Sequence, residues 1–239
     1  MIIDVHNHIG VDKDTTSQTA SQLLANMNEQ DIDNAFVFPF NEVKADLITA
    51  SLNLLDESKK NTKFIPLLRF DPNKIKLSEL ESILPKFKGV KLHPRSQNFD
   101  PLDKKYFKIY AMIEKSGKPL LFHTRKEQIV FSDPDRIVGL AEKFPKLNII
   151  LGHFAAASSI AIEKVGSSKN LFLETSVMSS PRLFEMVVEK IGSEKIMFGS
   201  DSPYSDQEIE LLKIKKAKLN EEDKENILHR NATRLFKLK

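Results

Sequence analysis

The stretch Ile2-Ile3-Asp4-Val5-His6-Asn7-His8 joins a short apolar run to two histidines near the N-terminus. A nearly continuous apolar run is typical of a strand that is buried on both faces in a parallel sheet. Because side chains alternate along a strand, His6 and His8 point to the same face. The stretch therefore predicts a buried parallel strand whose end carries two imidazoles on one side.

Further apolar runs follow along the chain, with amphipathic segments between them. Counting from the first, the runs are Ile2–Val5, Ala35–Phe38, Phe64–Leu68, Gly89–Leu92, Leu120–Phe122, Ile149–Leu151, Leu171–Leu173 and Ile196–Phe198. Strands that alternate with helices, without a break in composition, predict an α/β fold, a single (β/α)8 TIM barrel over residues 1–239. An open doubly wound sheet is the main competitor, but no glycine-rich phosphate loop follows the first run.

Several of the intervening segments carry helix-start signals. Asp133-Pro134 and Ser180-Pro181 place a capping side chain directly before a proline, and Ser78 precedes an acidic turn. Such residues satisfy the unpaired N–H groups of a first helical turn. We expect helices to begin at these three positions.

The composition limits the partners and the metal chemistry. The 36 Lys and Arg residues nearly balance 33 Asp and Glu, so the formal net charge of +3 is too small to indicate nucleic acid or membrane as a partner. The chain has no cysteine, so a metal would be held by imidazole and carboxylate, which suit zinc, manganese, iron or nickel. Without a leader pattern or a long apolar run, we expect a cytoplasmic protein with a small-molecule substrate, and we allow for a homodimer.

Most of the histidines fall at the ends of predicted strands. His6, His8, His93, His123 and His153 do so, as does Asp201 after the last strand. The carboxyl ends of barrel strands converge on one mouth, where enzymes of this fold keep their chemistry. A histidine pair can arise by chance, and one such as His153 can be a hydrogen-bonded core residue. The shared placement of the whole set favours a metal site.

Imidazole and carboxylate ligands can hold a catalytic metal with one position open for water. A metal in such a site lowers the pKa of that water and polarises a substrate oxygen. A basic group must then move the proton, and His153 and Asp201 are the candidates.

Five segments resemble successive motifs of the amidohydrolase superfamily. They are Asp4-Val5-His6-Asn7-His8, Gly89-Val90-Lys91-Leu92-His93-Pro94, Phe122-His123-Thr124, Leu151-Gly152-His153 and Phe198-Gly199-Ser200-Asp201-Ser202-Pro203, and the final segment from Glu225 to Phe236 resembles the family's last helix. The most similar branch is the amidohydrolase-related group that includes aminocarboxymuconate semialdehyde decarboxylase and metal-dependent hydrolases. The resemblance runs along nearly the whole chain in the right order.

The resemblance implies one divalent metal, for which we expect zinc, held by His6, His8, His123 and Asp201. It implies that His153 is a catalytic histidine beside the metal and that Asp201 also accepts a proton. Some relatives carry a carboxylated lysine that bridges two metals, so a binuclear site with a modified Lys91 stays open.

Arg69, His93 and Arg125 are the candidates to bind substrate, because an arginine can hold a carboxylate through two hydrogen bonds. The alternative for the arginines is a surface or helix-capping role. We expect a hydrolase that uses a metal-activated water on a small, carboxylated or ring-containing substrate. Non-oxidative decarboxylation is the alternative, and a non-catalytic metal-binding barrel is disfavoured because ligands and proton-transfer residues are both present.

Overall fold

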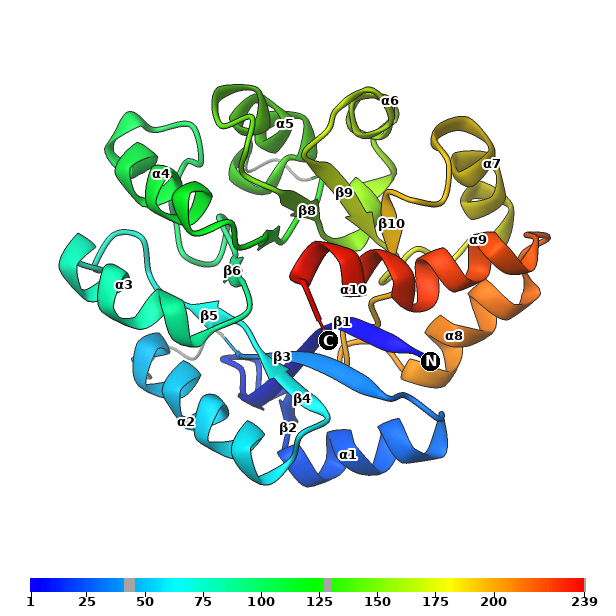
Figure 1. Cartoon of the computed structure of the whole chain (residues 1–239), viewed down its shortest axis with the longest axis horizontal. Helices are drawn as coiled ribbons and strands as arrows, with labels where there is room; N and C mark the ends of the chain where they lie inside the picture. Colours follow the sequence, from blue (N-terminus) through cyan, green and yellow to red (C-terminus); the bar gives the residue numbers. More distant parts are fainter. Residues whose placement is uncertain (41–45, 127–129, 239) are drawn as a thin grey trace.

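The strands form a ring in the centre of the molecule and the helices surround it (Figure 1). This computed structural model describes residues 1–40, 46–126 and 130–238. The ring consists of β1 (Ile3–Val11), β3 (Asn34–Pro39), β4 (Phe64–Pro66), β5 (Leu68–Arg69), β6 (Val90–Leu92), β7 (Leu120–Phe122), β8 (Ile149–Leu151), β9 (Leu171–Glu174) and β10 (Ile196–Met197). A short β2 (Ser17–Gln18) pairs antiparallel with the end of β1, whereas neighbouring strands within the ring are parallel. The strands coincide with the predicted runs, so the TIM-barrel prediction is confirmed.

Backbone hydrogen bonds join the two ends of the chain of strands. The N–H of Val5 donates to the carbonyl of Phe198 at 2.9 Å, and the N–H of Asp201 donates to the carbonyl of His6 at 2.8 Å. The strand expected at Phe64–Leu68 is divided into β4 and β5, because its bonding partner changes within it. Leu67 donates to Val37 of β3 at 2.9 Å, whereas Leu68 donates to Gly89, just before β6, at 3.0 Å.

A β-bulge in β1 sets the direction of its side chains. The register with β3 shifts between Asp4 and Asn7. Without the shift, Val5 and His6 would point to opposite faces. With it, Val5 packs among the inner barrel residues and His6 still reaches the site at the end of the barrel. Bulges next to active sites commonly re-aim a side chain in this way.

Helices follow the strands and cover their outer faces. They are α1 (Ala20–Glu29), α2 (Leu47–Lys60), α3 (Leu77–Ile83), α4 (Phe107–Ser116), α5 (Pro134–Lys143), α6 (Ser159–Ser167), α7 (Pro181–Ile191), α8 (Gln207–Lys216), α9 (Glu221–Glu225) and α10 (Asn231–Phe236). Asp133 and Ser180 cap α5 and α7 as predicted. The prediction for Ser78 was wrong, because α3 begins at Leu77 and its N-cap residue, Lys76, makes no side-chain capping bond.

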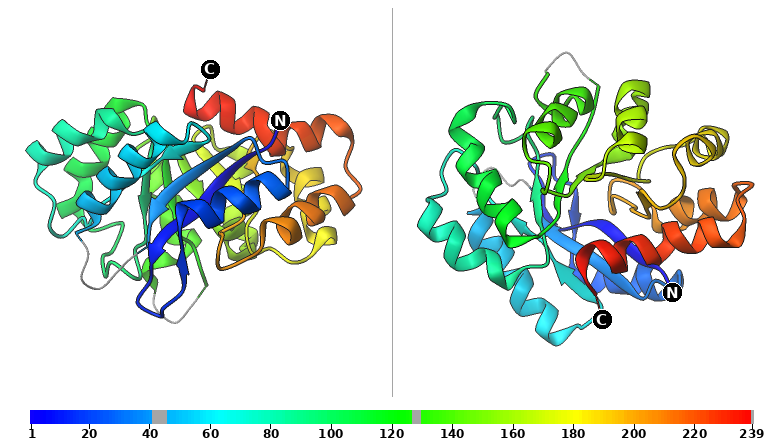
Figure 2. Two further views of the ribbon diagram at one scale, coloured as in Figure 1. Left: turned by 90° about the horizontal axis from the view of Figure 1, so that it is seen from below. Right: turned by 45° about the horizontal axis from the view of Figure 1, so that its top comes forward.

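The core has two layers, one inside the barrel and one between strands and helices. At the amino-terminal end of the barrel strands α10 lies across the opening, and the Phe236 ring meets that of Phe36 with centroids 4.1 Å apart. Burying a phenylalanine side chain contributes about 1.5–3 kcal/mol to the stability of the fold, so Phe236 helps to hold α10 over this opening. Both termini lie at this end, and the β1–β2 hairpin projects from the other (Figure 2).

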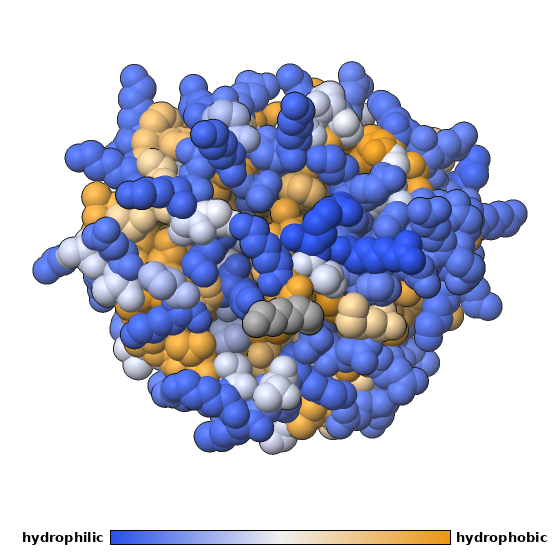
Figure 3. Space-filling model, in the orientation of Figure 1, coloured by the Kyte–Doolittle hydropathy of each residue, from blue (hydrophilic) through white to orange (hydrophobic). Residues whose placement is uncertain are grey.

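Hydrophilic side chains predominate on the face that carries the termini, where apolar residues form small scattered groups (Figure 3). Among the described helices, none has the length and apolar character needed to cross a membrane. The carboxyl ends of the strands meet at the opposite end of the barrel.

Candidate metal centre

A cavity of about 820 Å³ opens at the carboxyl end of the barrel. All the predicted site residues except His6 line it: His8, Arg69, His93, His123, Arg125, His153 and Asp201. His6 is fully buried, but its imidazole contacts Asp201. The structure thus brings the whole predicted set to one end of the barrel, as the positions at the strand ends require.

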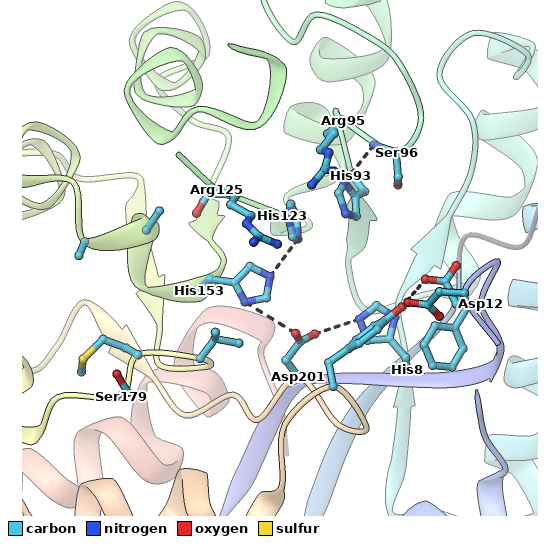
Figure 4. A pocket seen from close by; sticks show the side chains of 18 of the residues that line it. His8, Asp12, His93, Arg95, Ser96, His123, Arg125, His153, Ser179 and Asp201 are labelled. Carbon is cyan, nitrogen blue, oxygen red and sulfur yellow. Dashed lines mark hydrogen bonds and ion pairs between the residues drawn. The ribbon is translucent and has the colours of Figure 1, made fainter. Parts of the chain in front are cut away.

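Asp201 is the centre of the cluster (Figure 4). Its Oδ1 lies 3.0 Å from Nε2 of His6 and 3.1 Å from Nε2 of His8. His153 approaches from the other side, with Nδ1 3.9 Å from Oδ2. Among the described residues, His6, His153 and Asp201 form a group whose ligand atoms all lie within 4.8 Å of one another.

His123 and His153 face each other across the cluster, with Nδ1 of His123 2.9 Å from Nε2 of His153. Within the described part of the chain, Nδ1 of His8 and Nε2 of His123 are buried without a hydrogen-bond partner. Unsatisfied buried imidazole nitrogens beside a shared carboxylate are costly unless a further group completes them. The donor set, imidazoles and one carboxylate, therefore fits a divalent metal.

Glu174, at the end of β9, accepts hydrogen bonds from two residues of this cluster. Its Oε1 accepts from Nδ1 of His6 at 3.0 Å and from the N–H of His153 at 2.5 Å. Its Oε2 accepts from the N–H of Ser176 at 2.7 Å. Burial would raise the pKa of this carboxyl, but His6 and the hydrogen bonds lower it to about 2. Glu174 is therefore a carboxylate that orients a ligand imidazole by accepting its second N–H.

Two glycines leave room for Glu174. A Cβ on Gly152 would lie 2.7 Å from the carbonyl of Phe122 and 3.3 Å from Oε1 of Glu174. A Cβ on Gly199 would clash with Oε2 of the same carboxylate. These glycines, one residue before His153 and two before Asp201, let the backbone approach the buried carboxylate closely.

His153 and Asp201 both have left-handed backbone conformations, with φ of 51° and 61°. The left-handed stretch continues from His153 through Ala157, at a cost of roughly 1–2 kcal/mol per residue. Such strain persists only where the surroundings hold it, and it is concentrated at functional sites. Here the N–H of His153 is held by Glu174.

Lys91 is fully buried, and its Nζ lies 3.0 Å from Nε2 of His6. Burial lowers the pKa of Lys91 to about 7, against the opposing effect of Asp201. The amine is thus next to a predicted ligand. The predicted alternative of a modified Lys91 is compatible with that position.

The predicted substrate-binding residues lie on the cavity wall. Arg69 is 1% exposed, and its Nη1 donates to the carbonyl of Pro39 at 2.7 Å. Among the described residues its Nε has no hydrogen-bond partner. The ring of His93 stacks on that of His123 at 3.7 Å between centroids, and Arg95 and Arg125 lie beside these two histidines (Figure 4).

Comparison with known proteins places this site in a family. The family model of the amidohydrolases matches residues 3–238. The chain belongs to the amidohydrolase family. The match confirms the resemblance seen in the sequence motifs of this amidohydrolase. No curated protein sequence matches the chain.

Solved structures share the fold over the full length of this amidohydrolase. The 5-carboxyvanillate decarboxylase of Sphingomonas paucimobilis has a TM-score of 0.80 at 17% identity, covering 100% of this chain and 99% of that one. A dihydroxybenzoic acid decarboxylase of Polaromonas, with bound manganese, has 0.78 at 17% identity, covering 99% and 97%. A candidate 2-pyrone-4,6-dicarboxylic acid hydrolase of Pseudomonas putida has 0.75 at 14% identity, covering 100% and 98%.

Sequence reasoning assigned no role to Glu174, Phe40, Tyr204 or Asp12. The ring of Phe40 stacks on His8 at 4.9 Å, and that of Tyr204 meets His8 edge-on at 5.4 Å. The Tyr204 hydroxyl donates to Asp12. Phe40 and Tyr204 thus cover one side of His8, and we call this pair of rings the aromatic wall. For the aromatic wall, the sequence signal was the position of Tyr204 three residues after Asp201.

Metal binding should release a proton from His6. Burial and Lys91 act to lower the pKa of His6, but Asp201 and Glu174 outweigh them and raise it. A metal needs the lone pair that the proton occupies, so below this raised pKa the metal affinity should rise about tenfold for each unit of pH increase. Calorimetric titration of chelator-stripped protein in buffers of different ionisation enthalpy measures the released protons.

The control for this prediction is His229→Ala, which removes an imidazole from the π-helical segment Asn226–Arg230. It should leave the number of released protons unchanged. A metal affinity that is constant across pH 6 to 7, roughly the range around an ordinary imidazole pKa, would contradict the prediction.

Proposed function

We propose that this amidohydrolase is a metal-dependent decarboxylase that releases CO2 from a small ring-bearing carboxylic acid. The proposal rests on the position and burial of the Arg69 side chain. It is a buried guanidinium on the wall of the same cavity that the candidate ligands line, and its Nε has no partner among the described residues. A planar guanidinium matches a carboxylate through paired, charge-assisted hydrogen bonds.

The comparisons support decarboxylation ahead of the hydrolysis that the sequence placed first. Two of the three similar structures are decarboxylases by name, and both names denote carboxylic acids. The candidate hydrolase among them keeps hydrolysis as the second function. The same ligands and proton-transfer groups would serve either reaction, because the two differ in which bond of the substrate is presented to them.

The residues of the chain suit the steps of a decarboxylation. A bound divalent metal would polarise substrate oxygens as a Lewis acid. Arg69 would bind the acid group, and the aromatic wall (Phe40 and Tyr204) would flank the ring and exclude water. When the carbon–carbon bond breaks, its electron pair stays on the ring carbon, which must then receive a proton. His153 and Asp201 border the cavity and would hold or move that proton.

For the metal, we propose zinc, because three imidazoles and a carboxylate suit it. Manganese is the alternative, since it is bound in the similar Polaromonas enzyme. We expect one ion per chain. Two ions together with a mass increase on Lys91 would indicate the binuclear form. Elemental analysis and intact-mass measurement of the purified protein distinguish these cases.

The function is tested by supplying the metal-loaded protein with a panel of hydroxylated aromatic carboxylates, lactones and amides. We expect CO2 release from at least one ring carboxylate, with the ring product formed in equal amount. Hydrolysis of a lactone or amide without CO2 release would replace the proposal by the second function. Loss of either activity on metal removal, and its return on metal addition, would show that the reaction depends on the metal.

Arg69→Met should weaken the use of a carboxylate substrate. A charge-assisted hydrogen bond contributes about 1.5–3 kcal/mol, so we expect kcat/KM to fall about 10- to 100-fold, mainly through KM. Arg69→Lys keeps the charge and should recover part of the loss. The matched control is Arg136→Met, which removes an arginine paired with Asp100 outside the cavity. Equal losses in the Arg69 and Arg136 variants would rule out a specific role for Arg69.

A further inference from the structure

Ser176 connects the buried carboxylate of Glu174 to the imidazole of His153. Its Oγ lies 2.8 Å from Oε1 of Glu174 and 2.8 Å from Nδ1 of His153. Ser176 and Glu174 are both completely buried. The three groups therefore form a short chain of hydrogen bonds that runs from the end of β9 to His153, two residues after the end of β8.

The hydrogens of this chain can be assigned from its geometry. A serine hydroxyl has one hydrogen, and an ionised carboxylate has none. If Ser176 donated to His153, its oxygen would face Oε1 of Glu174 at 2.8 Å with no hydrogen between them. The hydroxyl must therefore donate to Glu174, and its lone pair accepts a hydrogen from Nδ1 of His153.

We propose that Ser176 and Glu174 are positioning residues that hold His153 as the tautomer with hydrogen on Nδ1 and a basic Nε2. The free nitrogen then faces Nδ1 of His123 at 2.9 Å, on the side where the candidate ligands meet. The hydrogen bond made by one ring nitrogen decides the protonation of the other. A proton-transferring His153 needs this nitrogen, so the pair prepares the imidazole for its role.

We call the hydrogen-bonded chain from Glu174 through Ser176 to His153 the relay. Glu174 also connects the relay to the metal ligands. The oxygen that accepts from Ser176 also accepts from Nδ1 of His6 and from the backbone N–H of His153. One carboxylate oxygen thus orients a ligand imidazole, a strained backbone and, through Ser176, the proton-transfer imidazole. Because Ser176 serves only the last of these, its replacement isolates the relay from metal binding.

The tautomer can be observed without any substrate. In metal-free protein labelled with 15N-histidine, long-range 1H–15N correlation spectra at neutral pH distinguish protonated from free ring nitrogens, and His153→Asn identifies the His153 signals. The same spectra show whether one or both ring nitrogens carry hydrogen, so they also report whether the ring is neutral. We expect Nδ1–H in the unaltered protein and a mixture or a reversed tautomer in Ser176→Ala.

A matched control removes a buried hydroxyl elsewhere. Ser193 is 1% exposed and its Oγ accepts from Asn226 at 3.0 Å, away from the cluster. Ser193→Ala should keep the Nδ1–H tautomer, and Ser176→Thr should restore it. An Nε2–H tautomer in the unaltered protein, or an unchanged spectrum in Ser176→Ala, would overturn the proposal.

A kinetic measurement rests on the proposed function, whereas the tautomer measurement does not. In metal-loaded Ser176→Ala we expect kcat to fall 10- to 100-fold, the range typical of residues behind a ligand or catalytic imidazole, with metal content and KM nearly unchanged. An unaltered kcat would overturn the role in proton transfer. If the tautomers behave as expected and no decarboxylation is found, the proposed function fails while the relay stands.

Discussion

His6→Asn is expected to purify without bound metal and to lose activity by on the order of 10³-fold or more. His6 is completely buried, and its Nε2 lies 3.0 Å from both Asp201 and Lys91. An asparagine can still donate to Glu174, but it offers no ring nitrogen on the cavity side. Losing several kcal/mol of Lewis-acid stabilisation corresponds to three or more factors of ten in rate.

Elemental analysis after dialysis against the metal, with activity measured on the same samples, checks this expectation. His123→Ala should behave in the same way if His123 is a ligand. Circular dichroism and thermal unfolding establish that the variants are folded, and His229→Ala serves as the control that loses an imidazole outside the cavity. Full metal content in His6→Asn would remove His6 from the ligand set.

The convergence of the site could be predicted from the sequence because it depends on strand ends alone. His93, His123 and His153 each follow a short apolar run, and parallel strands bring such positions to one rim. The pair His6 and His8 was placed on one face by parity. These inferences need only the identity and order of the strands, which the continuous apolar runs supply.

The bulge in β1 could not be predicted in the same way. Strict alternation from Val5, an inner barrel residue, would turn His6 outward. The register shift between Asp4 and Asn7 corrects this, and Asp4 then accepts from Gln207 and Ser200 on the outer side. A shift of pairing register depends on the partner strand and on long-range packing, so the local sequence carries no clear sign of it.

The role of Glu174 was also beyond sequence reasoning. It depends on β8 and β9 being adjacent and in a register that pairs Leu151 with Leu173. It depends as well on a left-handed backbone at His153, which no propensity favours for histidine followed by phenylalanine and alanines. Gly152 and Gly199 were the available signals, because each lacks a Cβ where the carboxylate approaches.

His153→Asn is expected to retain nearly stoichiometric metal while turnover falls by on the order of 10²–10⁴, the usual contribution of a positioned acid–base group. Both ring nitrogens of His153 are engaged, Nδ1 with Ser176 and Nε2 with His123. His8 and His123 instead have buried nitrogens that lack a partner among the described residues. His6 also has both ring nitrogens engaged, but its Nε2 contacts the carboxylate of Asp201, whereas the Nδ1 of His153 is bonded to Ser176. We therefore expect His6, His8 and His123 to bind the metal and His153 to transfer the proton.

The compact group of His6, His153 and Asp201 supports the opposite assignment, in which His153 binds the metal. Parallel measurement of metal content and kcat in His153→Asn and His123→Ala separates the two. Retained metal with lost turnover in the first variant, and lost metal in the second, assigns proton transfer to His153. An empty site in His153→Asn would make it a ligand, and Asp201, whose carboxylate already contacts His6 and His8, would remain as the proton-transfer group.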